Sequence, residues 1–414
     1  MAASPKWQFK TKFRANAYGW RGSKLAITRL KEAVKEIRTA AKSDPVAAGD
    51  GCVALMERLW PALQHIDTSS GALGTAVHNA LEDLIPLLIS APADRDTRAK
   101  WLERLFDAVQ EDGVEYLDPV AERWGEIARY PDLVNQYADM LLDRIRDAWA
   151  DHQRYNHVIG SAICLSCLLE AGRYDELRSL LALRRHRFWS DDRFAADALL
   201  RQGLWQEAIA YAEASRSKIN GAFSDHAIDR YCEDILIQQG RSDEAYGRYG
   251  LASALATTNL ATYRALARKY PERDRRQVLI DLIETRGNKG KWFAAAKDAG
   301  FLDIALNCAA ATDADPATLV RAARDFVGKQ PEFAMAVGVL AIRSLLSGGG
   351  YEPLLSESAS AVRHIMAAAA SIGVTDWAIQ QIGLALQQPC VKGREVFRDS
   401  GTAELGRQQA QART

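Results

Sequence analysis

The chain has 414 residues and carries 53 basic and 53 acidic side chains, so its formal net charge is zero. Apolar residues make up 48% and charged residues 26% of it, values that exclude a wholly disordered protein. Six cysteines are too few for a disulfide scaffold in a chain of this length. No apolar run approaches the roughly 18 residues that a membrane span needs. The amino terminus also lacks the apolar core of a secretory signal, so we expect a cytoplasmic protein that does not enter a membrane.

The first 22 residues form a basic arm in which cations and aromatic side chains are interleaved. Residues 1–43 hold eleven Lys or Arg residues against two acidic residues, a net charge of +9. Lysine and arginine can hold phosphates while aromatic rings stack on unpaired bases, so this composition is compatible with nucleic-acid binding. The residues that would make these contacts are Lys6, Lys10, Lys12, Arg14, Trp20, Arg21 and Lys24.

The composition of the basic arm is also compatible with binding to an acidic protein surface, within the chain or outside it. Residues 91–150 carry fourteen acidic residues against eight basic ones, so the arm can dock on this acidic part of its own chain. Its aromatic side chains would then be buried as staples; they are Trp7, Phe9, Phe13, Tyr18 and Trp20. An acidic protein partner is the third alternative, because the same cations would attract it.

Residues 23–155 are expected to form an N-terminal helical region. Its first predicted helix, over residues 23–42, has Leu30, Val34 and Ile37 on one face. The cations of this helix lie largely away from that apolar face, which is typical of a solvated surface. They are Lys24, Lys31, Lys35, Arg38 and Lys42.

Three further apolar stripes have the i, i+3, i+4, i+7 spacing of amphipathic helices. The first runs from Leu73 to Leu88, and we expect Pro86 to kink this helix because proline lacks a backbone donor. The second covers residues 101–109 and stops at Gly113, and the third covers residues 131–149.

Several residues are predicted to begin helices. Asp118 and Asp315 each precede a proline, a common arrangement in which the carboxylate caps the helix. Ser224 or Asp225 can cap the helix that follows them. Because no sustained run alternates β-branched with polar residues, we predict an all-α fold.

Four segments between residues 156 and 300 share an apolar helix end, a turn with glycine and a short amphipathic helix. They are CLLEAGRYDELRSLL (167–181), ALLRQGLWQEAIAYA (198–212), ILIQQGRSDEAYGRY (235–249) and LIETRGNKGKWFAAA (282–296). Their glycines, at 172, 203, 240 and 287, are 31, 37 and 47 residues apart, and the first three stand where a helix must end in the left-handed conformation. These blocks resemble tetratricopeptide-type helical hairpins. The resemblance implies an α-solenoid of irregular helical hairpins, a superhelix like those of tetratricopeptide and HEAT repeats.

A second resemblance covers the two ends of the chain. The segments KFRANAYGWRGSKLAITRLKEAVKEI (12–37), DTSSGALGTAVHNALEDLIP (67–86), KWFAAAKDAG (291–300) and RAARDF (321–326) resemble an uncharacterised family of bacterial helical proteins. This family has no established activity, so the resemblance implies no catalytic residue. We expect a C-terminal helical region over residues 301–390 and a frayed tail over residues 391–414, where apolar periodicity is lost.

The motifs that carry enzymatic or metal chemistry are not found. Cys164 and Cys167 form a C-x2-C with His152 and His157 upstream, but their i, i+3 spacing in an apolar helix fits buried thiols better than a zinc site. Neither GWRGSK (19–24) nor RGNKGKW (286–292) has the spacing of a phosphate-binding loop. Nucleophile elbows and H-E-x-x-H motifs are also missing. We therefore predict no catalytic residue, metal or cofactor, while a helical-repeat DNA glycosylase stays open because it needs only a basic concave surface, aromatic residues and one carboxylate.

Two basic clusters follow the arm in the chain. Arg184, Arg185 and Arg187 adjoin two aromatic residues, and residues 264–276 hold six more Lys or Arg residues. Ordinary solvated helix ends account for both clusters, unless they line up with the arm in a basic groove.

The sequence as a whole predicts a non-enzymatic scaffold that binds another protein through its helical-repeat surface. The candidate contact residues are Trp205, Tyr211, Tyr246 and Tyr249, each of which also suits the core between repeats. The alternative function is nucleic-acid binding through the basic aromatic arm.

Overall fold

Every element of the protein is helical in the computed structural model, which describes residues 6–151, 158–216 and 222–412. No strand occurs in these three ranges, so the predicted all-α class is confirmed. The chain divides into two units, Met1–Ile228 and Asp229–Thr414, which we call unit 1 and unit 2.

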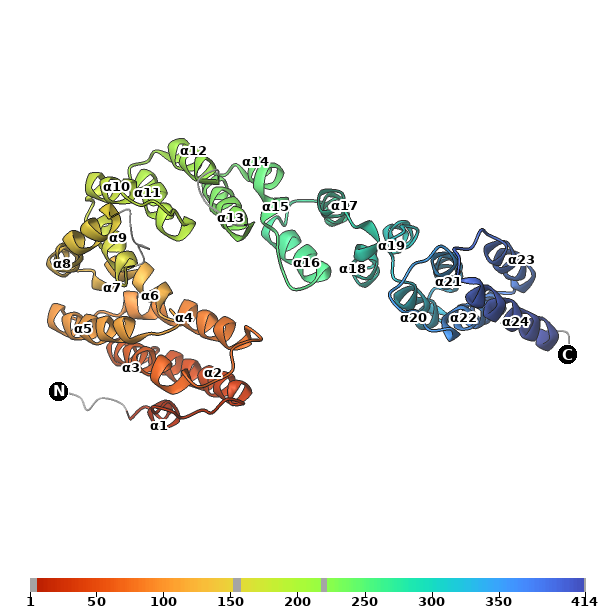
Figure 1. The fold of residues 1–414 in the computed structure, drawn as a ribbon, viewed down its shortest axis with the longest axis horizontal. Helices are drawn as coiled ribbons and strands as arrows, with labels where there is room; N and C mark the ends of the chain where they lie inside the picture. The colour runs from red at the N-terminus through yellow and green to blue at the C-terminus, as the bar shows by residue number, and fades with distance from the viewer. Residues whose placement is uncertain (1–5, 152–157, 217–221, 413–414) are drawn as a thin grey trace. The chain divides into compact units, whose positions relative to one another are not determined.

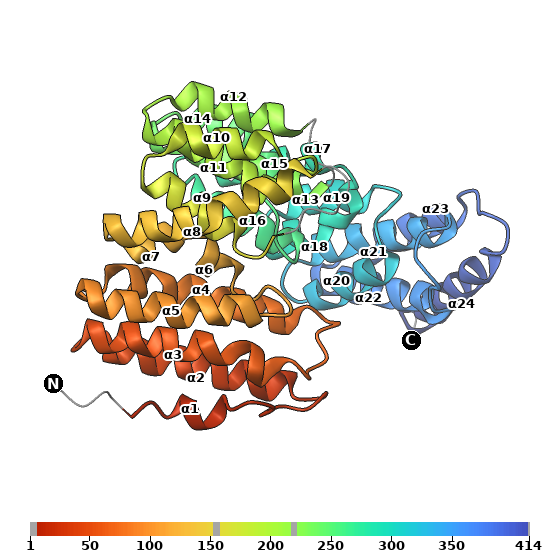
Figure 2. The ribbon, with the colours of Figure 1, turned by 60° about the vertical axis from the view of Figure 1, so that its left-hand side comes forward.

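Unit 1 consists of helical hairpins that follow one another along the chain (Figures 1 and 2). Its helices are α1 (Phe9–Lys12), α2 (Ser23–Ala40), α3 (Pro45–Leu63), α4 (Ala72–Ser90), α5 (Arg95–Glu111), α6 (Asp118–Glu122), α7 (Trp124–Ala128), α8 (Pro131–Ala150), α9 (Ser161–Glu170), α10 (Tyr174–Ala182), α11 (Trp189–Arg201) and α12 (Trp205–Ser215). α2 packs on α4, α4 on α6 and α7, these two on α9, and α9 on α11, while α3 packs on α5. We call α2, α4, α6, α7, α9 and α11 the first row of unit 1.

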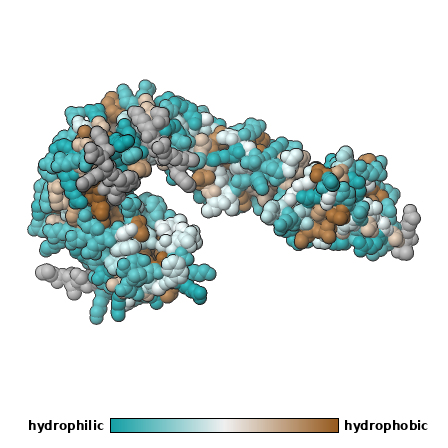
Figure 3. All heavy atoms as spheres, viewed as in Figure 1, coloured by the Kyte–Doolittle hydropathy of each residue, from teal (hydrophilic) through white to brown (hydrophobic). Residues whose placement is uncertain are grey.

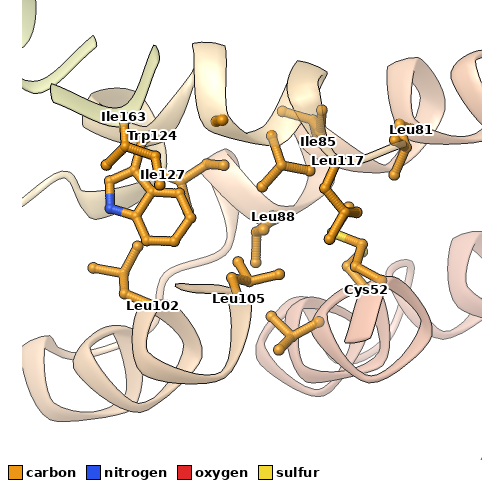
Figure 4. Close-up of a cluster of buried hydrophobic side chains, with 14 of the residues drawn as sticks. Cys52, Leu81, Ile85, Leu88, Leu102, Leu105, Leu117, Trp124, Ile127 and Ile163 are labelled. Carbon is orange, nitrogen blue, oxygen red and sulfur yellow. The ribbon is translucent and has the colours of Figure 1, made fainter. Parts of the chain in front are cut away.

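The apolar stripes expected from the sequence form the core of unit 1. Seven positions of the α4 stripe, from Leu73 to Leu88, are buried, and α4 continues through Pro86 as one helix. Figure 4 shows part of this core, with side chains from α3, α4, α5, α7 and α9; the fully buried ring of Trp124 lies beside Leu102, Ile127 and Ile163. The positions from Leu133 to Trp149 in α8 are buried in the same way. The 3.6-residue period therefore located these helices correctly.

A buried arginine joins two helices of the first row. Arg98, at the start of α5, has no exposed surface, and its guanidinium donates to the carbonyls of Ile127 (2.7 Å), Ile89 (2.9 Å) and Ala91 (2.5 Å). Ile89 and Ala91 lie at the carboxyl end of α4, where backbone carbonyls have no partner within the helix. Arg98 thus satisfies the end of α4 and ties it to α7.

Unit 2 begins within α13 (Ala222–Gln238) and continues through short helices to a C-terminal group of longer ones (Figure 1). Its further helices are α14 (Ser242–Ala245), α15 (Leu251–Ser253), α16 (Asn259–Lys269), α17 (Arg275–Arg286), α18 (Phe293–Asp298), α19 (Leu302–Ala309), α20 (Pro316–Phe326), α21 (Pro331–Leu346), α22 (Ser356–Ile372), α23 (Thr375–Leu386) and α24 (Glu395–Ala412). A π-helical turn over Tyr246–Gly250 joins α14 to α15. On the face of unit 2 that Figure 3 shows, hydrophobic residues gather over α20 and α22.

The prediction of a frayed tail after residue 390 is wrong, because most of this segment forms α24. This helix packs on α22 and α23 and buries Phe397 and Glu404. Gly401 lies between them, and a Cβ atom there would come within 2.6 Å of the Ser358 hydroxyl of α22. The packed face of α24 therefore depends on a glycine and a charged residue, which no search for apolar periodicity detects.

All three glycines that the sequence predicted to end helices in the left-handed conformation do so. Gly172, Gly203 and Gly240 have positive φ angles of 71°, 76° and 72°. After each glycine, the next backbone N–H donates to a carbonyl five residues earlier, as in a Schellman motif. Gly287 does not form this motif; Gly300 does, through the bond from the N–H of Phe301 to the carbonyl of Ala296 at 3.0 Å.

The predicted helix starts are correct in one case of three. Asp315 caps α20 by accepting a hydrogen bond from the N–H of Thr318 at 3.0 Å. Asp118 is instead the first residue of α6, with Leu117 at the cap position, and makes no cap bond. α13 begins at Ala222, before both Ser224 and Asp225.

Candidate functional site

The basic arm packs on unit 1 through its aromatic side chains. Trp7, Phe9, Phe13 and Tyr18 are all buried. Trp7 lies so close to α3 that a Cβ atom on Gly51 would come within 2.5 Å of its ring. Because these rings belong to the core, they are closed to stacking on nucleic-acid bases. The prediction that the aromatic residues of the arm act as buried staples is therefore correct for four of the five.

The fifth aromatic residue and most of the arm's cations remain at the surface. Trp20 is 68% exposed, and Lys6, Arg14, Arg21 and Lys24 are also exposed.

Two arm cations lie near acidic residues of the same unit, one of them in an ion pair. Lys12 forms an ion pair with Glu32 of α2 at 2.7 Å. Lys10 lines a cavity of about 450 Å³ together with Arg14, Glu57 and Asp107. Asp107 belongs to the acidic stretch 91–150, so part of the arm lies beside the acidic segment that the sequence offered as its internal partner.

A different group of cations surrounds a groove of about 760 Å³ between α2 and α4, which we call the α2–α4 groove. Its floor is apolar and is made by Ile27, Leu30 and Val34 of α2 with Ala76 and Ala80 of α4. α2 and α4 pack directly against each other, so the groove follows the seam between them. None of the seven arm residues predicted as binding residues lines it.

The sequence builds the floor from two helical stripes. Ile27, Leu30 and Val34 are three and four residues apart, so they project from one face of α2. Ala76 and Ala80 are four residues apart on α4, and their small side chains leave a depression where larger ones would fill the seam. The α2–α4 groove is therefore a consequence of alanines opposite a branched apolar stripe.

The rim of the α2–α4 groove is basic. Lys31, Lys35, Arg38 and Lys42 border it with spacings of four, three and four residues, and Asp83 of α4 is the one acidic residue in its lining. Together these five side chains carry a formal charge of +3.

Three of these cations have no ion pair. Arg38 lies 3.4 Å from Asp83, with both side chains exposed. Lys31, Lys35 and Lys42 form no ion pair with any residue in the described parts of the chain. Their ammonium groups are therefore available to an anionic ligand.

A second groove on the same row has the opposite character. A cavity of about 360 Å³ is lined by residues of α6, α7, α9 and α11, and we call it the α7–α11 groove. All three of its arginines are paired with carboxylates that also line it. The pairs are Arg123 with Glu126 (3.0 Å), Arg193 with Glu122 (3.1 Å) and Arg201 with Glu170 (2.7 Å).

The four residues predicted to contact a partner are distributed between surface and interior. Trp205 is 36% exposed, and Tyr211 is half-buried, with its hydroxyl accepting a hydrogen bond from Arg187 at 2.7 Å. Tyr246 and Tyr249 are only 4% exposed, which contradicts their assignment to a contact surface. The Tyr246 hydroxyl is 2.6 Å from Asp281, and burial, followed by this hydrogen bond, raises the pKa of Tyr246.

Some cations of each further basic cluster are paired within their own unit, whereas Arg264, Arg268 and Arg275 of the second cluster form no ion pair in the described ranges. In unit 1, Arg184 pairs with Asp191, and Arg187 with Asp192 at 2.7 Å. In unit 2 the pairs are Lys269 with Glu233, Arg273 with Asp243, and Arg276 with Asp303. These cations stabilise local structure and differ in this respect from those of the α2–α4 groove.

Glu233 is a buried acidic residue whose role the sequence did not reveal. It is 1% exposed and accepts hydrogen bonds from Ser253 (2.5 Å), Tyr270 (2.6 Å) and Lys269 (2.9 Å). The π-helical turn brings Gly250 beside this carboxylate, where a Cβ atom would lie 3.2 Å from its Oε1 atom. Three donors hold the carboxylate in place, so its evident role is to join α13, α15 and α16.

The cysteine pair is buried in α9. Cys164 and Cys167 have no exposed surface, and burial raises the pKa of the Cys164 thiol to about 12. His152 and His157, the remaining residues of that motif, lie outside the described residues. Within the described ranges, no cluster of three or more His, Cys, Asp or Glu side chains is suited to hold a metal ion. No helix in these ranges is both long enough and apolar enough to cross a bilayer.

No protein-family model, curated protein or solved structure matches this chain. The resemblances to tetratricopeptide hairpins and to a bacterial helical family therefore stay predictions. The fold and the site together define a class: an all-helical protein of two units, the first of which carries an apolar groove with a basic rim. Three lysines of this rim form no ion pair within the described residues.

Proposed function

We propose that this protein is a cytoplasmic, non-enzymatic scaffold, an α-solenoid of irregular helical hairpins that binds another protein through the α2–α4 groove. The repeated contacts between every second helix of unit 1 support the solenoid. The Schellman turns at Gly172, Gly203 and Gly240 support it as well, because they reverse the chain after successive helices.

The observation that carries the proposal is the unpaired rim of lysines beside an apolar floor. Lys31 and Lys35 are one helical turn apart on α2, and like charges at this spacing destabilise a helix by about 0.2–0.5 kcal/mol per pair. This like-charge pair does not stabilise the isolated protein, whereas an anionic partner would reduce the repulsion. Elsewhere on the same row, in the α7–α11 groove, every arginine is neutralised by a carboxylate.

The apolar floor favours a protein over a nucleic acid as the partner. A phosphate backbone is held by cations and by polar groups, and unpaired bases need exposed aromatic rings. The floor supplies aliphatic and methyl groups, with Ile27 and Ala76 partly exposed. Such a surface matches the apolar side chains of a protein segment.

Nucleic-acid binding is the second candidate function, and the observation that favours it is the exposed ring of Trp20. Trp20 is 68% exposed next to Arg21 and close in sequence to Lys24, both exposed. This combination is suited to stacking on an unpaired base while cations hold the adjacent phosphates.

The test of the proposed function is selection from a displayed peptide library on the intact chain. We expect the selected peptides to bind the wild-type protein and to lose binding to a groove variant, Lys31→Glu/Lys35→Glu/Lys42→Glu. A matched control variant, Lys100→Glu/Arg144→Glu/Lys392→Glu, changes the same number of exposed cations, none of which lines the groove, and should bind normally.

Labelled single-stranded and duplex oligonucleotides, measured by fluorescence anisotropy at two salt concentrations, complete the experiment. Failure to select any peptide whose binding depends on the groove would refute the proposal. Salt-sensitive oligonucleotide binding that is lost in Trp20→Ala/Arg21→Glu/Lys24→Glu would then establish the second candidate in its place.

A further inference from the structure

We infer that the segment held by the α2–α4 groove is an acidic amphipathic helix of a partner protein, lying along α2. This inference rests on the proposed function and adds the chemistry and conformation of the partner segment. It follows from three properties of the groove: the spacing of its cations, the shape of its floor and the lack of backbone partners for an extended peptide.

Three cations of the rim, Lys31, Lys35 and Arg38, have the spacing of an α-helix because they belong to α2, and Lys42 follows two residues after the last residue of that helix, Ala40. From Lys31 to Lys42 the chain advances eleven residues, which corresponds to about 16 Å along the helix axis. A second helix lying beside α2 advances by the same rise per residue. Carboxylates placed four, three and four residues apart on that helix would therefore meet successive cations of the rim over about three turns.

The floor accommodates the apolar face of the same helix. Ala72, Ala76 and Ala80 repeat every four residues along the α4 side of the groove. Small side chains let another helix approach within the roughly 8–10 Å between axes that packed helices adopt. Opposite them, Ile27 is partly exposed and offers a branched side chain against which leucine or isoleucine can pack.

An extended peptide suits this groove less well. The described residues of the protein contain no strand whose edge would pair with one, and the polar side chains in the lining other than ions are limited to Thr39, Thr75 and Asn79. An extended backbone would leave most of its N–H and C=O groups without protein partners, whereas a helix satisfies its own. The charge of +3 around the lining then selects helices with acidic residues beside the apolar face.

The direct test uses three synthetic peptides of about 18 residues, long enough to cover the groove. The first has leucines on one helical face and glutamates beside them at the four, three, four spacing. The second has the same composition in an order that destroys the helical period, and the third has lysine in place of each glutamate. Each peptide carries a fluorophore, and its binding to the full chain is measured by anisotropy at low and at physiological salt.

We expect the first peptide to bind best, and the groove variant Lys31→Glu/Lys35→Glu/Lys42→Glu to weaken it at least tenfold, or about 1.4 kcal/mol. Ala76→Phe, which fills the depression and leaves every charge in place, should also weaken binding at least tenfold. The control variant Lys100→Glu/Arg144→Glu/Lys392→Glu should stay within twofold of wild type. Circular dichroism melts establish that each variant is folded.

Four results would overturn the inference in distinguishable ways. Equal binding of the first two peptides would show a general attraction of negative charge without recognition of a helix. If the library yields groove-dependent peptides that are neither acidic nor helical, the inference fails while the proposed function stands. A concentration-dependent dimer of the chain that the groove variant abolishes would show that a second copy occupies the groove. If no peptide of either experiment depends on the groove, both proposals fail.

Discussion

The two grooves on the first row of unit 1 are formed by the same kind of helix packing, yet their charges are used differently. In the α7–α11 groove the cations are arginines, each paired with a carboxylate at 2.7–3.1 Å. In the α2–α4 groove three of the four cations are lysines, and none of these lysines is paired within the described parts of the chain. The comparison separates charges that are paired within the protein from charges that have no such pair.

The chemistry of the two side chains explains the division. The planar guanidinium of arginine forms fixed, often bidentate bonds, which suits links such as Arg201 of α11 with Glu170 of α9. A lysine ammonium group sits on a flexible stem and adapts to different anions. Substitutions that act on one groove and spare the other therefore test the comparison directly.

The largest effect is expected from removal of Arg98, which joins α4 of the α2–α4 groove to α7 of the α7–α11 groove. Arg98→Ala should lower the free energy of unfolding by about 5 kcal/mol, because it leaves two buried carbonyls and one partly buried carbonyl, at the end of α4 and in α7, without their donor and each such loss costs about 1–3 kcal/mol. Arg98→Lys, which keeps the charge but not the fork, should recover only part of this loss. Urea unfolding measures both changes, and an Arg98→Ala protein as stable as wild type would contradict this role.

A slightly smaller loss should follow from removing an aromatic staple of the arm. Phe13→Ala is expected to cost about 3–5 kcal/mol, because its ring is fully buried. The neighbouring exposed residue is the control: Arg14→Ala should change stability by no more than about 0.5 kcal/mol. Similar melting temperatures for both variants would mean that the arm is not part of the core.

Neutralising the cations of each groove should change stability in opposite directions. Lys31→Gln/Lys35→Gln removes a like-charge pair from α2 and should stabilise the protein at low salt by about 0.2–0.5 kcal/mol. Arg201→Gln removes the pair with Glu170 and should destabilise it by up to about 1 kcal/mol. Denaturant titrations at low and high salt measure both, and a loss of stability in the lysine variant would remove the distinction between the grooves.

The smallest effect is expected for an exposed arginine–carboxylate ion pair in unit 2, of the same type as the pairs in the α7–α11 groove. The Arg276 guanidinium holds the pKa of Asp303 at about 2, below the usual value of 3.8. Since this pKa is lowered in the folded state, the pair stabilises the protein above about pH 4 and ceases to do so as the pH falls toward 2. The difference in melting temperature between wild type and Asp303→Asn should therefore be small at pH 7 and smaller still at pH 3; a difference that grows on acidification would contradict this assignment.

Local patterns in the sequence were sufficient to predict most of the long helices and the α2 side of the α2–α4 groove. The apolar residues Leu30, Val34 and Ile37 are all buried as predicted, and Lys31 and Lys35 lie on the predicted basic face. Helical periodicity repeats within a few residues, so the spacing of apolar residues in one helix is enough to predict which of its side chains are buried. The glycine turns were predicted for the same reason, since a left-handed residue is a local requirement.

The sequence alone therefore determined an all-helical fold, the turns at Gly172, Gly203 and Gly240 and the existence of a basic amphipathic α2. The other features depend on contacts between residues that are distant in the sequence. The groove forms because α4 packs beside the basic face of α2, and the ring of Trp7 fits against α3 because residue 51 is glycine. Glu233 accepts hydrogen bonds from three donors on neighbouring helices. These contacts have no local signature, because they depend on which helices pack together and how closely. For the same reason, the folded arrangement was needed to see that four aromatic residues of the arm are buried in the core, while Lys31 and Lys35 of α2 are exposed and have no ion pair in the described ranges.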